Sequence, residues 1–511
     1  MTIVNSIINW INYKRIYEID LYRDHSKEIQ QEVLFNLLNS AKSTEWGEKY
    51  DYRNTKSWEC YSQNVPVTRY ETIEPLINRM IQGEKSVLWP GVMKWFAKSS
   101  GTTNAKSKFI PVSKESLDDC HFRGGKDVLA IYYRNNPEAS LFSGKSLTLG
   151  GSHQETNLSN KAYYGDLSAI IIENLPFWTD FHRTPPTDIA LIPEFEEKIA
   201  QITKTAIHEN VTSLAGVPSW FLVLLHYILE YTGKSSITEV WPNLELFIHG
   251  GVSFDPYRIQ YKRLIPSANM HYMETYNASE GFFAIQDDPT SQDMLLMLDY
   301  GVFYEFILAG KTEEEYPVTI PLWEVELGVN YAIVISTNGG LWRYLIGDTL
   351  VFTSKSPYKI RITGRTKHFI NAFGEEVIID NAERAIKGAC LATGAIISEY
   401  TAGPIFMTES QSKGAHQWLI EFNTPPDNLD KFTSVLDLEL QSLNSDYEAK
   451  RHKNATLEMP HVLAVPTGTF LQWMRERGKI GGQNKVPRLS NNREYLDDLL
   501  RIYTENKLNK V

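Results

Sequence analysis

The chain has 511 residues, of which 42% are hydrophobic and 22% charged, and its formal net charge is −11. A chain of this size buries a large core and is expected to form two or three domains. The acidic balance argues against a protein that binds nucleic acid or an anionic membrane, because both partners select a basic surface. Cys60, Cys120 and Cys390 are widely separated and indicate neither a disulfide framework nor a zinc site, which favours a cytoplasmic protein.

Residues 1–85 have the pattern of a helical lead-in. The first twenty residues predict an amphipathic helix and not a signal peptide, because asparagines interrupt the apolar residues and no small-residue cleavage site follows. Charged and apolar residues then mix at helical spacing over residues 23–49. The later apolar stretch 220–231 is shorter than the ~18 residues of a membrane span. Since Pro218 and Gly233 bound it, it predicts a buried helix.

From residue 92 onward, β-rich runs alternate with helical patterns. Residues 244–248, 294–298 and 331–335 predict strands, and residues 194–208 predict a helix, which together indicate an α/β core. Beyond residue 365 the pattern predicts a smaller α+β unit. Its expected helices are 375–390 and 428–442, and its expected extended segments are 394–407 and 416–422.

Small hydroxyl residues, one glycine and three lysines gather in residues 98–108. Glycine lets a backbone approach an anion closely, hydroxyl and N–H groups donate to phosphate oxygens, and lysine supplies positive charge. The segment therefore predicts a phosphate-binding loop, although ordinary polar loops have a similar composition. Its spacing differs from GxxxxGK[ST], so the common phosphate-loop NTPase fold is not expected. Lys106 and Lys108 either pair with a leaving pyrophosphate or are solvated surface lysines. The candidate phosphate ligands are Ser99, Ser100, Gly101, Thr102 and Thr103.

Three further motifs follow this loop: YNASEG at 276–281, GLWRYLIGD at 340–348 and GRTK at 364–367. In this order they resemble the acyl-adenylate-forming superfamily. Within it, the chain resembles the GH3 acyl acid amido synthetases through WPN at 241–243, GGV at 250–252 and QNKVPR at 483–488. The resemblance covers roughly residues 92–488.

This resemblance implies an α/β fold with a large α/β N-terminal domain of the adenylate-forming type and a small, mobile α+β C-terminal domain. Residues 1–364 would form the first domain and residues 365–511 the second, with the active site in the cleft between them. The implied activity is that of an ATP-dependent ligase, which activates a carboxylic acid as acyl-AMP and transfers the acyl group to the amine of an amino acid. The expected partners are these small substrates, with no nucleic acid and no membrane, and the oligomeric state stays open.

Adenylation is an in-line attack on the α-phosphorus of ATP, so the protein mainly positions groups and stabilises charge. A carboxylate at Glu280 beside phosphates is costly unless a cation intervenes, which implies Mg²⁺. Asp348 is expected to accept from ribose hydroxyls, and Tyr276 offers a flat face to adenine. Lys485 lies in a Gly/Asn/Gln loop that could bring its charge to the α-phosphate. Glu280 and Lys485 are therefore the catalytic candidates.

The resemblance adds further nucleotide-site candidates: Gly250, Gly251, Val252, Asn277, Ala278, Ser279 and Arg365. Each motif also has a simpler interpretation: an exposed loop glutamate at 280, turns at 250–251 and 347–348, and a basic tail residue at 485. The chain departs from the plant pattern at Leu345, where plant members carry arginine, and at Glu376, where they carry lysine. At these two positions the chain therefore lacks the cations that the plant members carry.

Two alternatives to amide formation stay open. One is an acid-thiol ligase that uses the same adenylation step and forms an acyl-CoA thioester, and the other is a non-catalytic relative that only binds nucleotide. The histidines show no metal-binding spacing, and we expect His249 and His271 to be structural. The identity of the acid is not specified by the sequence. Four aromatic residues are candidates for an acid pocket: Phe177, Trp178, Trp220 and Phe221.

Overall fold

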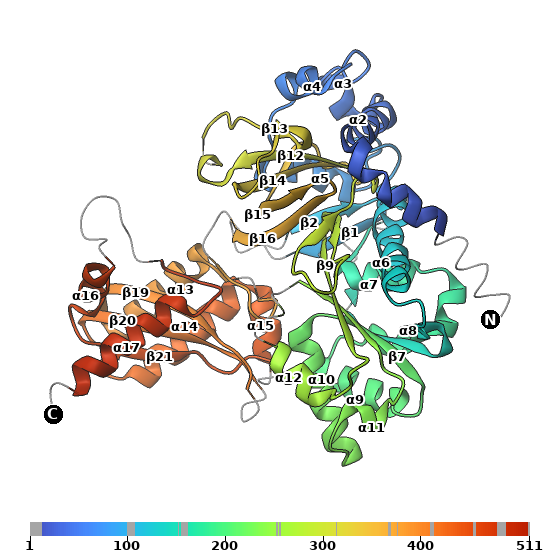
Figure 1. Cartoon of the computed structure of the whole chain (residues 1–511). Coiled ribbons are helices and arrows are strands. Elements are labelled where there is room, and N and C mark those ends of the chain that lie inside the picture. Colours follow the sequence, from blue (N-terminus) through green and yellow to red (C-terminus); the bar gives the residue numbers. More distant parts are fainter. Residues whose placement is uncertain are drawn as a thin grey trace.

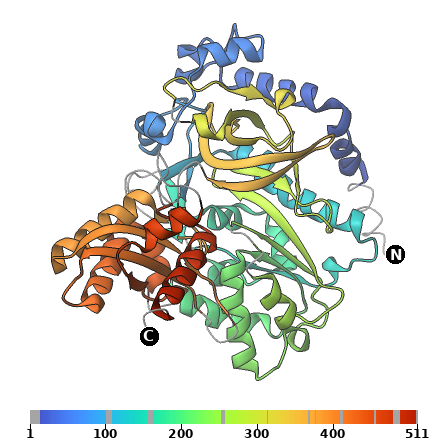
Figure 2. The ribbon, with the colours of Figure 1, turned by 60° about the vertical axis from the view of Figure 1, so that its left-hand side comes forward.

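The computed structural model describes residues 13–99, 108–151, 153–154, 162–251, 254, 257–312, 314–365, 369–375, 377–408, 413–452, 456–477 and 487–508. They form a mixed α/β protein with a large N-terminal domain and a smaller C-terminal domain (Figure 1). The C-terminal domain, coloured orange and red, lies beside the part of the N-terminal domain that carries α10 (Pro218–Thr232) and α12 (Arg258–Leu264), as both ribbon views show (Figure 2).

The lead-in is helical, as the sequence predicts. Residues 13–20 are helical, and residues 1–12 of the expected N-terminal helix lie outside the described residues. The predicted helix over 23–49 is divided in two, because the side chain of Thr44 accepts from Gly47 N and caps a new helix. The helices that follow residue 20 are α2 (Tyr22–Ala41), α3 (Glu45–Lys49), α4 (Trp58–Asn64) and α5 (Tyr70–Ile81).

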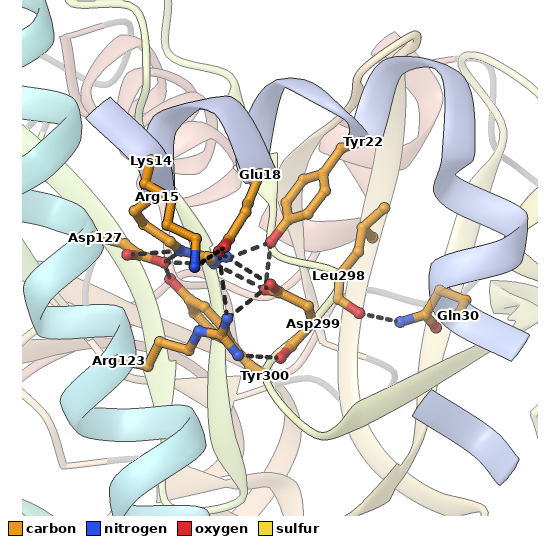
Figure 3. Close-up of polar contacts among 10 residues, drawn as sticks. All are labelled: Lys14, Arg15, Glu18, Tyr22, Gln30, Arg123, Asp127, Leu298, Asp299 and Tyr300. Carbon is orange, nitrogen blue, oxygen red and sulfur yellow. Dashed lines mark hydrogen bonds and ion pairs between the residues drawn. The ribbon is translucent and has the colours of Figure 1, made fainter. Parts of the chain in front are cut away.

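A polar cluster attaches the first helical segment to the N-terminal domain (Figure 3). Arg15 Nη1 lies 2.6 Å from Asp299 Oδ2, and Arg15 Nη2 lies 2.7 Å from Asp127 Oδ2. Tyr22 donates a short hydrogen bond to Asp299, and Tyr300 donates to Asp127. Burial by itself would raise the pKa of Asp299, but the hydrogen bond and charge of Arg15 hold it below the usual value. Charge pairing therefore holds the N-terminal segment in place.

Replacing Asp299 with alanine is expected to loosen residues 13–20. The substitution leaves Arg15 without one of its three carboxylate partners. A hydrogen bond to a charged group contributes about 1.5–3 kcal/mol, which corresponds to roughly tenfold or more in local opening. Hydrogen exchange of residues 13–20 measures this change, with Glu32→Gln as a control at an exposed glutamate of α2. Because the folded pKa of Asp299 is lowered, the attachment should also weaken as pH falls below ~4. Unchanged exchange in Asp299→Ala would contradict this role of the cluster.

The N-terminal domain is built around a sheet of twelve described strands. Neighbouring strands are antiparallel from β13 to β9 and parallel from β9 to β6. The pairing therefore changes from antiparallel to parallel at β9. In spatial order the strands are β13 (Ile320–Pro321), β12 (Val302–Leu308), β14 (Asn330–Thr337), β15 (Tyr344–Lys355), β16 (Tyr358–Arg365), β11 (Met294–Leu296), β10 (Gly281–Ile285), β9 (His271–Ala278), β8 (Leu246–Gly250), β7 (Val211–Gly216), β3 (Lys145–Leu149) and β6 (Arg183–Thr184).

The predicted strands at 244–248, 294–298 and 331–335 correspond to β8, β11 and β14, and the predicted helix at 194–208 corresponds to α9 (Phe195–Ala206). The apolar stretch 220–231 is α10, and Phe221 and Leu225 are fully buried in it. Within the described part of the chain, we find no helix with both the length and the apolar composition needed to cross a bilayer. The remaining helices of this domain are α6 (Phe122–Asn135), α7 (Leu167–Asn174), α8 (Thr187–Ala190) and α11 (Ile237–Val240).

A second, smaller sheet of the N-terminal domain contains both ends of the predicted phosphate loop. Its strands are in the order β2, β1, β5, β4, and β1 and β2 form an antiparallel hairpin in which Ser99 lies opposite Lys108. The strand bounds are β1 (Trp95–Ser99), β2 (Lys108–Val112), β4 (His153–Gln154) and β5 (Tyr163–Gly165).

The C-terminal domain has a three-stranded sheet covered by helices. The predicted extended segments 394–407 and 416–422 are β19 (Ile396–Ile405) and β20 (Ala415–Thr424), and the predicted helix 428–442 is α14 (Leu429–Leu443). The other elements are β17 (Phe369–Ile370), β18 (Val377–Ile378), β21 (His461–Val465), α13 (Ile379–Thr393), α15 (Ser445–Arg451), α16 (Thr469–Glu476) and α17 (Glu494–Leu508).

The predicted helix at 375–390 begins four residues later than expected, at Ile379. Glu375 is fully buried and non-helical, because its carboxylate accepts from Ala372 N and Phe373 N and lies 2.8 Å from His416 Nε2. A buried carboxylate needs such partners. Tertiary contacts at this position therefore override the local preference for helix.

Candidate functional site

The YNASEG motif forms a β-hairpin between β9 and β10. Ala278 lies opposite Gly281, so Ser279 and Glu280 are the two residues of the turn. Tyr276 is buried in β9, and its hydroxyl donates to Asp348 Oδ2 at 2.5 Å. The ring of Tyr276 packs edge-on against Phe283, with the centroids 4.9 Å apart. Stacking of adenine on Tyr276 stays a prediction.

Asp348 lies within β15, at a bulge and not at a simple turn. The pairing between β14 and β15 shifts register between Ala332 and Val334, and Gly347 has a φ of 101°, in the left-handed region that favours glycine. A bulge changes the direction of nearby side chains and often occurs beside a functional site. The Gly-Asp pair therefore places the carboxylate in contact with Tyr276, on another strand of the sheet.

Arg365 pairs with the second oxygen of the Asp348 carboxylate. Arg365 lies opposite Asp348 in the β15–β16 ladder, and its Nε lies 2.7 Å from Asp348 Oδ1. Both oxygens of Asp348 thus have a fixed partner, one neutral and one cationic. Three residues from three sequence motifs, Tyr276, Asp348 and Arg365, meet at one point.

Glu280 lies near this group, and the charges of Asp348 and Arg365 affect the pKa of its carboxyl group. Burial raises the pKa of Glu280, the positive charge of Lys108 opposes that shift, and the charge of Asp348 adds to it. The buried hydroxyl of Tyr344 has no hydrogen-bond partner among the described residues, and the charge of Glu280 contributes to the raised pKa of Tyr344. A polar ligand would satisfy the Tyr344 hydroxyl, because a buried hydroxyl is costly when unpaired, and a cation there would pair with the half-buried Glu280 carboxylate.

Lys108 is 8% exposed, so the alternative of a solvated surface lysine is wrong at this position. Its ammonium group lies 5.6 Å from the centroid of the Tyr70 ring, and its charge acts on Glu280. Ser99, opposite Lys108, is the one phosphate-loop candidate within the described residues. Six singled-out residues lie outside them: Ser100, Gly101, Thr102, Thr103, Lys106 and Val252. The same holds for Lys485 and Glu376.

Gly250 ends β8 next to the hairpin, and Gly251 follows it. An added Cβ at Gly250 would lie 2.4 Å from the carbonyl oxygen of Thr275, the residue before Tyr276. Gly251 has a φ of 83°, so glycine is favoured there as well. These two glycines let the end of β8 approach β9 closely. A simple turn at 250–251 would not need this close approach.

His121 is a site residue that the sequence did not indicate. It ends the π-helical turn Ser116–His121, and its Nδ1 lies 3.2 Å from the side-chain oxygen of Asn277. Burial lowers the pKa of His121 to about 4, so the imidazole is neutral near pH 7 and can donate to Asn277. A π-helical turn is often found at a functional site, but no residue pattern in the sequence announces one. The contact fixes Asn277 beside the hairpin turn.

Of the two departures from the plant pattern, the one at Leu345 lies in the described region and has a structural explanation. Leu345 packs in an apolar cluster with Ile307 and Val334, where a guanidinium would be unpaired. Arg343 forms a buried pair with Glu305. His249 stacks on Phe254 with the centroids 4.1 Å apart, as expected of a structural histidine, and burial lowers its pKa to about 3.

The two described aromatic candidates for the acid pocket, Phe221 and Trp220, lie in different surroundings. Phe221 is fully buried in the core and packs against Phe247, whereas Trp220 Nε1 donates to the carbonyl oxygen of Phe373 in the C-terminal domain. The side chains of Phe177 and Trp178 lie outside the described residues. Where the structure is described, no three His, Cys, Asp or Glu side chains converge to hold a metal ion.

Three family models match the chain: the GH3 family N-terminal domain at residues 15–270, the GH3 family central domain at 295–365 and the GH3 family C-terminal domain at 380–494. Among curated relatives, an indole-3-acetic acid-amido synthetase GH3.3 from Arabidopsis thaliana is 22% identical and aligns over 90% of this chain and 89% of its own length. A jasmonoyl--L-amino acid synthetase GH3.5 from Oryza sativa subsp. japonica is 22% identical, over 96% and 97% respectively.

Solved structures show the same fold. GH3.15 acyl acid amido synthetase superposes with a TM-score of 0.59 at 19% identity, covering 94% of both chains. A 2-hydroxyisobutyryl-CoA ligase in complex with 2-HIB-AMP and CoA superposes with a TM-score of 0.57 at 11% identity, covering 94% of this chain and 92% of its own. The fold is therefore that of adenylate-forming enzymes. Since the N-terminal model alone covers half of the chain and the three models follow one another along it, the chain belongs to the GH3 family.

Proposed function

We propose that this protein is an ATP-dependent ligase that activates a carboxylic acid as acyl-AMP and transfers the acyl group to the amine of an amino acid. One observation carries the proposal: Tyr276 and Arg365 both contact the carboxylate of Asp348 within hydrogen-bond distance. Glu280 lies close enough for the charges of Asp348 and Arg365 to shift the pKa of its carboxyl group. The relatives support amide formation, since one is named an indole-3-acetic acid-amido synthetase and another a jasmonoyl-amino acid synthetase. We also propose that the enzyme is cytoplasmic and acts on small molecules. Neither nucleic acid nor a membrane is among its proposed partners.

ATP fits the side chains at this point. The two oxygens of Asp348 are held by Tyr276 and Arg365 but retain lone pairs, so the carboxylate can accept from two ribose hydroxyls. Glu280, whose pKa is raised by burial, would gain from a nearby cation, which fits Mg²⁺ bound by this one carboxylate and by phosphate oxygens. When bound, Mg²⁺ neutralises charge on the phosphates. Ser99 to Thr103 would hold the phosphates, and Lys108 would add positive charge next to them.

We further propose that residues 1–364 and 365–511 are the two domains and that the C-terminal domain is mobile. Lys485 would then bring its charge to the α-phosphate when the C-terminal domain closes. The cation of Lys485 should matter in the transition state more than in ATP binding, since interactions that form only there increase the rate.

ATP–pyrophosphate exchange with aromatic, fatty and short carboxylic acids tests adenylation. Acid-dependent exchange identifies the acid, and AMP release with the amino acids or with coenzyme A as acceptor then separates the amide from the thioester product. Release that depends on the thiol alone would support an acyl-CoA ligase, as the 2-hydroxyisobutyryl-CoA ligase fold leaves possible. ATP binding without exchange for any acid would support a non-catalytic nucleotide-binding protein.

Asp348→Asn is expected to raise the KM for ATP by about tenfold or more. The amide removes the charge that pairs with Arg365 and weakens acceptance from ribose, and a hydrogen bond to a charged group contributes about 1.5–3 kcal/mol. Exchange kinetics at varied ATP measure the effect. Asp293→Asn is a matched control, because Asp293 pairs with the exposed Arg361 and not with Tyr276 or Arg365. An unchanged KM in Asp348→Asn would remove Asp348 from the nucleotide site.

A further inference from the structure

A cavity of about 280 Å³ lies where the two domains meet. The N-terminal domain contributes Trp220 and Lys198 to its lining, and the C-terminal domain contributes residues of α15 and His452. Lys450 Nζ lies 4.7 Å from the centroid of the Trp220 ring, and His452 Nε2 lies 3.5 Å from Glu194 Oε1. These contacts join the two sides, so the cavity is bounded by both domains. Its volume is close to the lower end of the roughly 300–1,000 Å³ of small-molecule sites.

The lining carries charges of both signs. Its carboxylates are Asp166, Glu194 and Glu196 from the N-terminal domain and Asp446 from α15. Apart from Lys198, its cationic or titratable groups are Lys98, Lys450 and His452. A ligand with one ammonium and one carboxylate group is complementary to such a mixed lining, because each of its charges finds an opposite one. An α-amino acid, the acceptor of the proposed function, has this chemistry.

Lys198 is the most buried lysine of the lining, at 2% exposed against 7% for Lys450. It lies on α9, and its Nζ donates to the carbonyl oxygens of Gly150 and Gly151 at 3.2 and 3.1 Å. These acceptors are held in turn, since Gly151 N donates to Ser168 Oγ, and an added Cβ at Gly151 would lie 1.9 Å from Asp166 Oδ2. The ammonium position is therefore fixed by the fold.

The two carbonyl acceptors suit a neutral amine. A neutral lysine has two N–H bonds, which Gly150 and Gly151 accept, and it keeps a lone pair that can take a proton. Burial lowers the pKa of Lys198 to about 8, although the charge of Asp166 acts in the opposite direction. A group with a pKa near the working pH is the most effective proton acceptor. Lys198 thus combines a fixed position, access to a cavity and a suitable pKa.

We propose that this interdomain cavity admits the amino acid acceptor and that Lys198 Nζ removes the proton from its ammonium group. The inference rests on the proposed amide-forming function. Lys198 takes one proton and becomes an ammonium, and the acceptor becomes a neutral amine. The amine nitrogen then forms a bond to the acyl carbon of acyl-AMP, the C–O bond to AMP breaks, and AMP leaves with that electron pair. The remaining extra proton on nitrogen goes to solvent, and Lys198 later releases its own proton to solvent.

The test compares amino acids with hydroxylamine as acceptors of the acyl group. Hydroxylamine is uncharged in neutral buffer and needs no proton acceptor before it attacks. The variants are Lys198→Met, which lacks the amine, and Lys198→Arg, which still donates to the two carbonyls but stays protonated. Lys204→Met is the matched control, since Lys204 is exposed on the same helix. The acid is the one that gives the highest pyrophosphate exchange, and the acceptor is an equimolar mixture of the twenty protein amino acids, with the amide identified by mass.

For both Lys198 variants we expect amide formation to fall about 100-fold, while hydroxamate formation and pyrophosphate exchange stay close to wild type. The wild-type amide rate at saturating acceptor should level off near pH 8, and this inflection should disappear in Lys198→Arg. Equal loss with amino acids and hydroxylamine, or no loss with either, would overturn the assignment of Lys198. Wild-type exchange without any amide would overturn both the amino acid acceptor and Lys198, whereas no wild-type exchange would instead overturn adenylation itself.

Discussion

Glu280→Gln is expected to lower acid-dependent pyrophosphate exchange by roughly 10²–10³-fold, the usual loss when one group that stabilises a transition-state charge is removed. The glutamine keeps the size of the side chain at the hairpin turn but cannot offer a charged oxygen to Mg²⁺. Exchange measured over a range of Mg²⁺ concentrations checks the prediction, and excess Mg²⁺ should recover only part of the rate.

The control for this experiment is Glu324→Gln, a change at an exposed glutamate of the same domain, which should leave exchange unchanged. A Glu280→Gln enzyme with normal exchange at low Mg²⁺ would show that this carboxylate does not bind the metal. In that case the orphaned hydroxyl of Tyr344 would be the next residue to test, because it is the buried polar group beside Glu280 that the described chain does not satisfy.

Arg343→Met is expected to destabilise the N-terminal domain by about 3–5 kcal/mol, since it leaves Glu305 charged and buried. The two side chains are 5% and 1% exposed, and Arg343 donates to both oxygens of Glu305 and to the carbonyl oxygens of Ser62 and Val65. The pair therefore joins β12 and the residue just before β15 to the lead-in helix α4. Urea unfolding followed by tryptophan fluorescence measures the loss.

The matched control is Arg361→Met, which breaks the pair between the 52% exposed Arg361 side chain and Asp293 and should cost less than about 1 kcal/mol. Arg343→Met combined with Glu305→Leu should recover part of the stability, because removing both charges of a buried pair costs less than removing one. A single Arg343→Met variant as stable as wild type would mean that the pair contributes little, and a double variant no better than the single one would point to the lost carbonyl contacts.

The sequence predicted the elements whose pattern is local. The helix now seen as α10, the strands β8, β14, β19 and β20, and the helix α14 follow from apolar periodicity, because burial of one face or of a whole segment leaves a regular pattern. The start of α13 could not be predicted, because Glu375 is held out of the helix by His416, 41 residues away. Lys108 was left undecided for the same reason: only the folded chain shows that it is buried and near Glu280.

The sequence by itself determined the family, the α/β class and the set of motif residues, because these depend on residue types and on their order along the chain. The tertiary structure decided which of the described residues meet. It placed Tyr276, Asp348 and Arg365 together through strand pairing and a bulge, brought His121 to Asn277, and enclosed Lys198 at a cavity between the domains. Contacts between residues far apart in the chain depend on register and packing, and those arise only when the whole chain buries its surface at once.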